Sequence, residues 1–436
     1  MRIDQLTVTG FRCFEKAEFN FPHQFNLIVG ENGSGKTSLL EALSIAAGSW
    51  LLGIRGYDSR NIAEGDVRMV PIKAGDDVSF EEAELTEVSA VGWIEGGVII
   101  KGKQYEYTWG RSRRGRAGRT TRADAAFITR IATEAAGKLR MGKEVLLPLI
   151  SYYGTGRLWD FPKEMQGGLG APISKAEQSR FEGYRNSVDR RCSPVEFAKW
   201  LQRQAWIEFQ EKSEQPLSAV VRKAVIGCIE GGQKIWFSAK QGQVLVSIKG
   251  HGVLPFENLS DGQRNIVAMV GDIAIKAAKL YSHLGAKALE ETPGIVLIDE
   301  LDLHLHPRWQ RRVVADLKRT FPKLQFFCTT HSPQIIGEVP RDEILLVTPE
   351  GGKPVAVGLG ADSNWILKHV MGGAERNAQV QKLINQVDDA LDDGEMAKAK
   401  LALAKLGKVI GTTDEGEVAR LESSIRNLES LSHAED

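Results

Sequence analysis

The sequence is poor in cysteine. Its 436 residues include four cysteines, and no two of them form a C-x-x-C pair. They stand at Cys13, Cys192, Cys228 and Cys328. A structural zinc site needs closely spaced thiolate or imidazole ligands, and a disulfide framework needs many cysteines in a short chain. The pattern therefore excludes both, suits a reducing compartment and predicts a cytoplasmic protein.

Neither sign of charge is in excess, and long apolar runs are missing. Lysine and arginine total 56, aspartate and glutamate total 56, and the formal net charge is zero. A balanced chain has no overall field that attracts nucleic acid or membrane, so such a contact has to come from a local patch. The longest nearly apolar stretch, residues 42–54, contains serine and glycine and is too short to span a bilayer. We expect no membrane partner.

A long coiled-coil arm is also missing. The segment between Thr37 and Leu259 holds glycines, prolines and strand-like alternation, and it has no sustained heptad repeat. Coiled coils require such a repeat over many turns. With 42% hydrophobic residues, the chain is nevertheless long enough to bury a large core. The sequence therefore predicts a compact α/β head with smaller appendages.

Glycine, in contrast, is plentiful and marks the first functional segment. Residues 30–37 read G-E-N-G-S-G-K-T and match the phosphate loop G-x-x-x-x-G-K-[ST]. The flanking residues predict a strand over 24–29 and a helix over 37–53. In that order, the N–H groups of the loop and the helix N-terminus face a phosphate group. A glycine-rich turn can match the pattern by chance, but these flanks favour a site for ATP or GTP.

The residues of this loop have expected roles. Lys36 reaches the β- and γ-phosphate oxygens, and Thr37 offers its hydroxyl to Mg²⁺. Gly33 and Gly35 permit close approach of the backbone to the phosphates. The residues assigned to the nucleotide are Gly30, Asn32, Gly33, Ser34, Gly35, Lys36, Thr37 and Ser38.

A pair of carboxylates follows a second apolar run. Residues 295–298 read I-V-L-I, which predicts a buried strand, and Asp299 and Glu300 come directly after it. Asp299 is placed to hold Mg²⁺, and Glu300 is placed to orient an attacking water. The sequence therefore predicts nucleotide hydrolysis with Mg²⁺ held by Thr37 and Asp299, and with Glu300 and Lys36 as catalytic residues.

A third segment offers an anion-binding surface with no phosphate loop beside it. Residues 259–263 read L-S-D-G-Q and precede a predicted amphipathic helix over 266–280. The Ser260 hydroxyl and the Gly262 amide would lie at the helix N-terminus and face outward. We expect this segment to complete a nucleotide site on another molecule.

In this order the segments resemble the ABC ATPase superfamily, in which the signature LSGGQ (here LSDGQ) closes on the γ-phosphate of ATP held by another subunit. The resemblance implies a head-to-tail dimer or higher oligomer in which Ser260, Gly262 and Gln263 act in trans. His331, in T-T-H-S-P, matches the switch histidine that contacts the γ-phosphate, with a structural histidine as the alternative. Arg12, in F-R-C-F, resembles the nucleotide-contacting opening of RecF and SMC-type heads.

One position departs from the superfamily pattern. Residues 145–153 predict a buried strand where transporters of the superfamily place a glutamine loop, but no glutamine stands at its end. Tyr153 and Arg157 are the candidates for that position. The way in which transporters sense the γ-phosphate is therefore not carried over to this chain.

Two further runs carry charged or metal-binding side chains. One holds six arginines within twelve residues, at Arg111, Arg113, Arg114, Arg116, Arg119 and Arg122. This 111–122 loop is either solvated or binds a DNA backbone, and six phosphate contacts would give a log–log salt slope of about −5. His304 and His306 have a spacing open to a metal site. The run D-E-L-D-L-H-L-H-P instead resembles the interface loop of RecF-like and OLD-like heads.

Softer segments narrow the resemblance to the PtuA ATPases of Septu anti-phage systems, to which some retron ATPases are similar. They are residues 11–14, 151–159, 299–307, 329–334 and 360–367, and the narrower resemblance rests chiefly on the D-S-N-W-I-L run at 362–367 and on the C-terminal helical tail. This family implies a multimeric ATPase that controls DNA cleavage by a partner HNH nuclease, PtuB. Two alternatives stay open: a RecF-like DNA-repair ATPase that binds DNA directly, and a scaffold that uses ATP as structural glue.

The predicted fold is an α/β ABC-ATPase head of the P-loop NTPase class. It has a mixed central sheet, an antiparallel β subdomain, a helical lobe and a C-terminal helical appendage. Four domains are predicted: an ATPase lobe with the phosphate loop and a β insert over 1–160, a helical lobe or insert over 161–255, the signature, carboxylate and histidine half over 256–372, and a partner-docking segment over 373–436. Helices over 379–391, 395–409 and 415–428 form that last segment.

Overall fold

The computed structural model divides the chain into two compact units. It describes residues 1–74, 77–94, 99–100, 103–158, 179–189, 192, 194–373, 376–411 and 416–432. The first unit is Met1–Ile366 and the second is Leu367–Asp436. Trp159, at the end of one of the PtuA-like segments, lies outside the described residues. The finer domain boundaries at 160, 255 and 372 stay predictions.

The first unit is built on a mixed sheet of ten strands among the described residues, in the order β10-β14-β15-β3-β16-β17-β2-β1-β6-β9. Its first five strands run parallel. They are β10 (Leu149–Tyr153), β14 (Gly294–Ile298), β15 (Leu324–Thr329), β3 (Phe25–Val29) and β16 (Ile344–Thr348). Every residue of β10, β14, β15 and β3 is buried, as in strands covered on both faces. Because the strands are parallel, the loops that follow them meet at one edge of the sheet.

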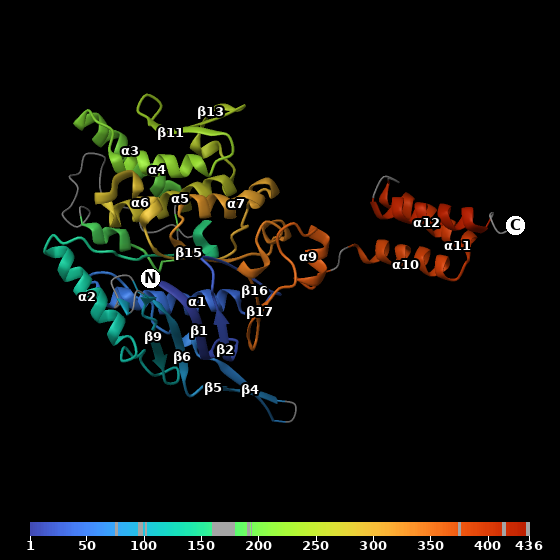
Figure 1. Ribbon diagram of the computed structural model, residues 1–436, viewed down its shortest axis with the longest axis horizontal. Coiled ribbons are helices and arrows are strands. Elements are labelled where there is room, and N and C mark those ends of the chain that lie inside the picture. The colour runs from blue at the N-terminus through green and yellow to red at the C-terminus, as the bar shows by residue number, and fades with distance from the viewer. Residues whose placement is uncertain are drawn as a thin grey trace. The chain divides into compact units, whose positions relative to one another are not determined.

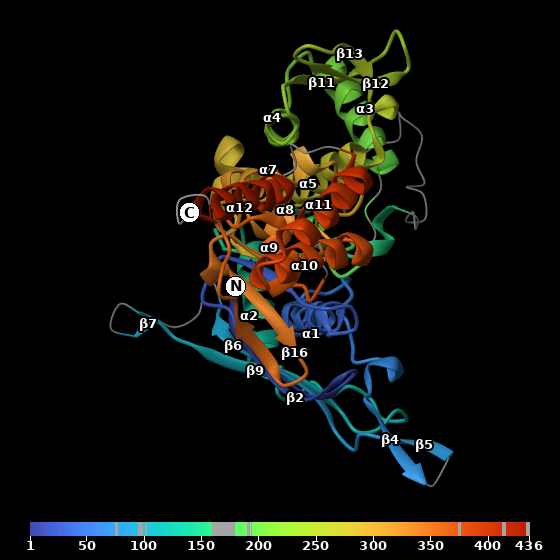
Figure 2. The same cartoon turned by 90° about the vertical axis from the view of Figure 1, so that its right-hand side faces the viewer.

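The other half of the sheet is largely antiparallel. Its strands are β17 (Gly351–Pro354), β2 (Phe14–Asn20), β1 (Arg2–Phe11), β6 (Thr86–Trp93) and β9 (Tyr107–Arg113). Along β6 buried and half-buried residues alternate, which is the pattern of a strand packed on one face. A hairpin of β4 (Met69–Ala74) and β5 (Asp77–Glu82) extends from this half (Figures 1 and 2). Short strands β7 (Ile99–Ile100) and β8 (Lys103–Gln104) pair with each other.

Helices cover both faces of the parallel strands. On one face lies α1 (Lys36–Gly48), which is almost wholly buried and contacts strands of both halves of the sheet. On the opposite face lie α5 (Asp261–Leu280) and α7 (Pro307–Thr320) (Figure 1). The remaining helices of the unit are α2 (Ala126–Arg140), α3 (Pro194–Glu211), α4 (Pro216–Gly227), α6 (Ala288–Glu291), α8 (Pro333–Ile336) and α9, which begins at Ser363 and ends at His369 in the second unit.

A helical lobe carries its own small sheet. Helices α3 and α4 lie beside the antiparallel strands β11 (Gly232–Ser238), β12 (Gln243–Ile248) and β13 (Gly252–Pro255), away from the central sheet (Figure 1). With the buried helix that follows the phosphate loop and the mixed sheet, this architecture confirms the predicted α/β P-loop ATPase head.

The second unit is a group of three helices. They are α10 (Ala378–Asp392), α11 (Met396–Ile410) and α12 (Gly416–Ser432). Each helix contributes to a shared core, for example through Val387, Leu406 and Leu421, all of which are fully buried. Polar helices of this length are marginal alone, so their mutual packing stabilises them.

Among the described residues, the helices are all too short or too polar to cross a membrane.

Candidate nucleotide site

The phosphate loop joins β3 to α1 at the carboxyl edge of the parallel strands. Gly30, Gly33 and Gly35 have φ angles of 154°, 81° and 102°, which side-chain-bearing residues rarely adopt. Gly35 is needed for a second reason: a Cβ there would lie 2.4 Å from Cζ of Phe14 and 2.7 Å from Sγ of Cys13. The turn before β2 therefore packs directly against the loop, in a contact that the pattern of glycines did not predict.

Lys36 and Ser34 supply polar groups inside this loop. The Lys36 Nζ donates to the carbonyl oxygens of Gly30 (2.9 Å) and Glu31 (2.8 Å). Burial lowers the pKa of Lys36, although the nearby carboxylates of Asp299 and Glu300 raise it in part. The Ser34 hydroxyl is buried and has no hydrogen-bond partner among the described residues. A buried hydroxyl without a partner is costly, and a phosphate oxygen in the loop would satisfy it.

The two residues predicted to hold Mg²⁺ touch each other. The Thr37 hydroxyl donates to the carboxylate of Asp299 at 3.0 and 3.3 Å, although 262 positions separate them in the sequence. Asp299 also accepts a hydrogen bond from the Thr329 hydroxyl at 2.6 Å. No cluster of three or more His, Cys, Asp or Glu suited to a metal occurs in the described part of the chain. Two hard oxygen ligands nevertheless fit Mg²⁺, which takes its other ligands from phosphate and water.

Glu300 and His331 lie in the adjacent loops. Glu300 is half-buried, and its backbone N–H donates to the Thr329 hydroxyl at 2.7 Å. The backbone N–H of His331 donates to Oδ1 of Asp302 at 3.2 Å, and Asp302 also accepts from the Thr330 hydroxyl at 2.6 Å. The loops after β14 and β15 are thus tied together through Asp302, and Thr329, two residues before His331, contacts Asp299.

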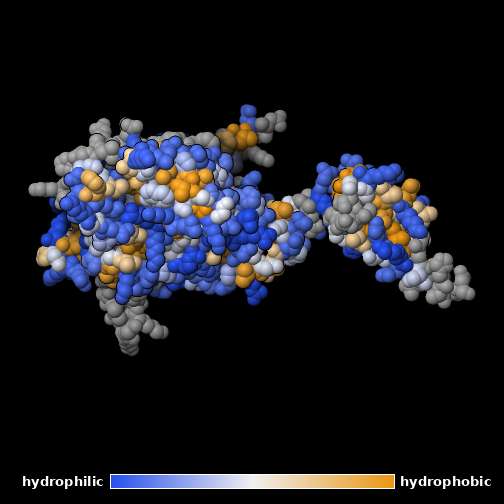
Figure 3. Space-filling model, turned by 90° about the horizontal axis from the view of Figure 1, so that it is seen from above, coloured by the Kyte–Doolittle hydropathy of each residue, from blue (hydrophilic) through white to orange (hydrophobic). Residues whose placement is uncertain are grey.

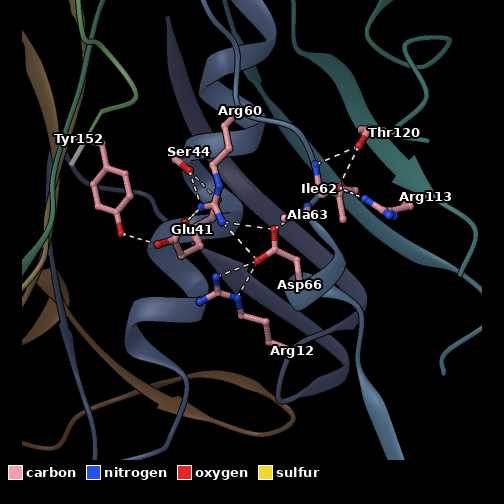
Figure 4. A network of polar contacts seen from close by, with 10 residues as sticks. All are labelled: Arg12, Glu41, Ser44, Arg60, Ile62, Ala63, Asp66, Arg113, Thr120 and Tyr152. Atoms are coloured by element: carbon pink, nitrogen blue, oxygen red, sulfur yellow. Dashed lines mark hydrogen bonds and ion pairs between the residues drawn. The ribbon is translucent and has the colours of Figure 1, made fainter. Parts of the chain in front are cut away.

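Arg12 is held by a partner that the sequence did not reveal. Its side chain forms an ion pair with Asp66 at 2.8 Å, and its φ is 50° (Figure 4). Asp66 is 1% exposed and also accepts from Arg60 at 3.2 Å and from the backbone N–H of Ala63 at 2.9 Å. This carboxylate therefore fixes Arg12 in the turn that packs on the phosphate loop.

The same polar network reaches the far strand β10. Arg60 forms an ion pair with Glu41 on α1, and Glu41 accepts from the Tyr152 hydroxyl at 3.1 Å (Figure 4). Glu41 is fully buried. A glutamate within the apolar run 39–47 was a signal in the sequence, because a buried charge requires a partner. The partners themselves could not be read from the sequence.

The LSDGQ segment forms the start of α5. Ser260 is the N-cap: its hydroxyl accepts from the backbone N–H of Gln263 (3.3 Å), while the Gln263 side chain accepts from the N–H of Ser260 (3.0 Å). Ser260 is exposed, whereas Gly262 is buried. A Cβ on Gly262 would lie 2.1 Å from the carbonyl oxygen of His304. The signature therefore packs on the loop after the carboxylates, and the side-chain hydrogen bonds of Ser260 and Gln263 stay within their own turn.

The prediction of one exposed loop with six arginines is wrong for two of them. Arg111 and Arg113 lie on β9, because the strand continues into the run. Arg111 is fully buried and donates to Asn61 Oδ1 (2.6 Å) and to the Thr121 carbonyl (2.8 Å), and burial lowers its pKa to about 10. The exposed members of the run are Arg114, Arg116, Arg119 and Arg122.

The histidines after the carboxylates have structural contacts. His306 is the N-cap of α7, and its Nδ1 accepts from the backbone N–H of Arg308 at 3.3 Å. His304 has a φ of 59° and presents its carbonyl to Gly262. The ring of His306 therefore has a structural role, whereas the contact of His304 is made by its backbone.

Two protein-family models match the chain. The model described as "AAA domain" matches residues 5–215, and the model described as "AAA domain, putative AbiEii toxin, Type IV TA system" matches residues 163–337. Together they span both the phosphate loop and the carboxylate half of the head.

Relatives of this chain come from retron and Septu systems. The retron Vc95 probable ATPase of Vibrio cholerae serotype O1 biovar El Tor is 24% identical over 80% of this chain and 73% of its own length. The retron Ec83 probable ATPase of Escherichia coli is 38% identical over 30% of this chain. Septu protein PtuA of Bacillus thuringiensis is 29% identical over 36% of this chain. The matched regions span only 24% of the Ec83 protein and 42% of PtuA.

Among solved structures, an SmcHead bound to the C-winged helix domain of ScpA has a TM-score of 0.45 and 16% identity. It covers 82% of this chain and 99% of its own.

Proposed function

Because this chain is an ATPase head related to the retron ATPases and Septu PtuA, we propose that it is the ATP-hydrolysing subunit of an anti-phage defence complex. In this proposal two heads bind each other head to tail. Each copy supplies the phosphate loop and carboxylates of one site and the LSDGQ segment of the other.

One observation carries the proposal. The phosphate loop and the carboxylates meet within one copy through Thr37 and Asp299, whereas Ser260 is exposed at the start of α5. An exposed helix N-terminus with a serine hydroxyl binds anions well. A second copy would bring this surface to the γ-phosphate and close the site.

Each residue then has a chemical task. Lys36 and the Ser34 hydroxyl bind the phosphate oxygens of ATP, and Thr37 and Asp299 hold Mg²⁺. When bound, Mg²⁺ offsets the charge on the β- and γ-phosphates. Glu300 orients water for in-line attack on the γ-phosphorus, with ADP as the leaving group, and His331 contacts the γ-phosphate. Arg12 contacts the nucleotide from the turn beside the loop.

A mixing experiment tests the sharing of sites. Lys36→Ala removes nucleotide binding, while Ser260→Asp places a negative charge against the γ-phosphate. Aspartate caps a helix as well as serine does, so α5 keeps its start. Lys36→Ala alone should be inactive, and Ser260→Asp alone should turn over roughly 10²-fold more slowly than wild type. An equimolar mixture should recover about a quarter of wild-type turnover, because half of random dimers are mixed and each mixed dimer has one intact site. A mixture as inactive as its components would contradict the proposal.

The second unit is the proposed docking site for a nuclease of the HNH type, similar to PtuB. Between α11 and α12 lies an open groove of about 640 Å³ with a mainly apolar lining that includes Leu403, Ala404 and Ile425. Apolar side chains are exposed on this unit (Figure 3). Lys400, Lys408, Arg426 and Glu422 also line the groove. An apolar helix with acidic flanks fits such a surface.

A matched pair of variants tests the docking. Ala404 lines the groove, whereas Val409, on the same helix, is 48% exposed and does not line it. The proteins are expressed together with their genomic neighbours and purified through this chain. Ala404→Arg should lose the nuclease, and Val409→Arg should keep it. Equal retention by both variants would remove the groove from the proposal.

A second function, direct DNA binding as in RecF, is supported by the exposed arginines. The exposed Arg119 and Arg122 and the half-buried Arg113 line a hollow of about 390 Å³ together with Asn61 and Ile62. Four exposed arginines in contact with phosphates would give a log–log salt slope of about −4 for duplex binding. A slope near zero would exclude this surface. Phosphate release at background level would instead favour a scaffold that uses ATP as structural glue.

A further inference from the structure

The loop after β10 contains a buried arginine aimed at the carboxylate loop. Arg157 is 1% exposed, and its Nη1 donates to the carbonyl oxygens of Asp299 (2.5 Å) and Gly154 (3.0 Å). Its Nη2 donates to the carbonyl oxygen of Glu300 at 2.6 Å. The guanidinium thus bridges two successive carbonyls at the residues proposed for metal binding and for catalysis, and only the planar fork of arginine offers this geometry.

The residue that Arg157 holds has an unusual backbone conformation. Glu300 has a φ of 51°, in the left-handed region that residues with a Cβ seldom adopt. Its N–H donates to the Thr329 hydroxyl on one side, and its carbonyl accepts from Arg157 on the other. Such a conformation persists only where surrounding contacts over-determine it. Arg157 and Thr329 provide those contacts.

The segment that carries Arg157 is itself fixed. The Tyr153 hydroxyl donates to Oδ2 of Asp272 on α5 at 2.7 Å, and the backbone N–H of Asp299 donates to the carbonyl of Tyr153 at 2.8 Å. Lys276 forms an ion pair with the same carboxylate of Asp272 at 2.8 Å. A buried arginine on a rigid support holds its partners with little freedom.

The charge of Arg157 lies among three carboxylates. Burial lowers the pKa of Arg157, and the carboxylates of Asp299, Glu300 and Asp302 oppose that effect. A buried cation is costly to keep, and the loss of Arg157 would leave the carbonyls of Gly154, Asp299 and Glu300 without their donor and the carboxylates without a nearby positive charge. Arg157 also lies in the loop where transporters of the superfamily place a glutamine and where this chain has none.

We propose that Arg157 is a positioning residue for ATP hydrolysis: by bridging the carbonyls of Asp299 and Glu300, it keeps Glu300 in the left-handed conformation from which its carboxylate orients the attacking water. The inference rests on the proposed ATPase function. Arg157 touches neither the nucleotide nor water in this role and acts through Glu300.

The test combines kinetics with a double-mutant cycle on the full chain. Arg157→Ala should lower kcat by about 10- to 100-fold and leave the ATP Kd within about threefold, because small misplacements of a catalytic group have effects of that size. In a Glu300→Gln background, Arg157→Ala should have no further effect on kcat, since both changes act on one group. Multiplicative effects would overturn the proposal, as would an unchanged kcat in Arg157→Ala.

Two measurements separate positioning from simple loss of structure. Millimolar guanidinium should restore part of the kcat of Arg157→Ala, and the same concentration of ammonium should not. If Arg157→Ala does not fold, Arg157→Lys keeps charge and bulk but cannot span both carbonyls. The kcat of Arg157→Lys should fall while ATP still binds, and a wild-type kcat in this variant would overturn the proposal.

The outcomes also separate this proposal from the proposed function. If the wild-type protein does not hydrolyse ATP, the proposed function is wrong. If the wild-type protein and Arg157→Lys are both active, only the role of Arg157 is wrong.

Discussion

Two regions of the proposed nucleotide site differ in how they are held. The first region, made of the loops after β3 and β14, is joined by contacts within one chain. The second region, the exposed start of α5, forms its side-chain hydrogen bonds within its own turn. Thr37 contacts Asp299 across the edge of the sheet, while Ser260 bonds to Gln263 in its own turn. The first region also packs on a buried polar network, in which Asp66 holds Arg12 beside the phosphate loop and Glu41 lies on the helix that follows the loop. The second meets the first through the close contact of Gly262 with His304.

This difference indicates which parts of the site have to be preorganised. A phosphate and a divalent cation are bound well by groups that are fixed before the ligand arrives. In the proposed function the exposed start of α5 binds the phosphate held by a second copy, and those contacts would have to be reversible. Substitutions in the two regions should therefore differ in their effects on ATP binding, turnover and stability.

The largest effect is expected within the first region. Glu300→Gln should lower turnover by roughly 10²- to 10⁴-fold, because the amide no longer acts as a base. ATP binding should persist, since the phosphate loop is untouched. Phosphate release and a nucleotide titration measure the two quantities. Glu31→Gln, at an exposed position of the phosphate loop, is the control and should keep the wild-type rate of ATP hydrolysis. Full turnover in Glu300→Gln would assign the base elsewhere.

The second region should show its effect in turnover alone. Ser260→Asp should reduce the rate by roughly 10²-fold, the size expected when a donor to a developing charge is lost. The melting temperature should not change, because the capping interaction is kept. If binding of ATP by the isolated chain fell as steeply as turnover, Ser260 would belong to the site of its own copy.

The contact between the regions can be tested with two glycines. Gly262→Ala forces a Cβ against the His304 carbonyl and should lower the free energy of unfolding by about 2–3 kcal/mol. Gly137, within α2, has no atom within 4 Å of its Cβ position. Gly137→Ala should instead stabilise the chain by about 0.5–1 kcal/mol. Denaturant unfolding measures both, and equal values would show that the signature does not pack on the carboxylate loop.

The smallest effect concerns the support beneath the phosphate loop. Tyr152→Phe removes the hydroxyl that donates to buried Glu41 and should destabilise the chain by about 1.5 kcal/mol. Tyr105 is 50% exposed, and Tyr105→Phe should be neutral. Thermal unfolding of the two variants measures the difference. A neutral Tyr152→Phe would mean that Arg60 alone satisfies Glu41.

Much of the fold and of the candidate site could be predicted from short stretches of sequence. The strand before the phosphate loop, the apolar strand before Asp299 and the α/β class followed from periodicity and glycine placement, because these features depend on neighbours in the chain. The prediction of an exposed arginine loop was wrong at Arg111 because it also depended on local composition. Arg111 carries a charge, but it belongs to strand β9 and is buried there. The partners of Arg12 and Arg157 lie about 54 and 143 positions away and left no local signal.

The sequence alone determined the chemistry available to this protein, because the phosphate loop, the carboxylate pair and the signature are each defined by residues adjacent in the chain. Only the tertiary structure decided how these groups are held. Strand order and packing bring distant segments to one edge of the sheet. They produce the contact of Thr37 with Asp299, the close approach of Gly262 to His304 and the hydrogen bond from Arg157 to the Glu300 carbonyl.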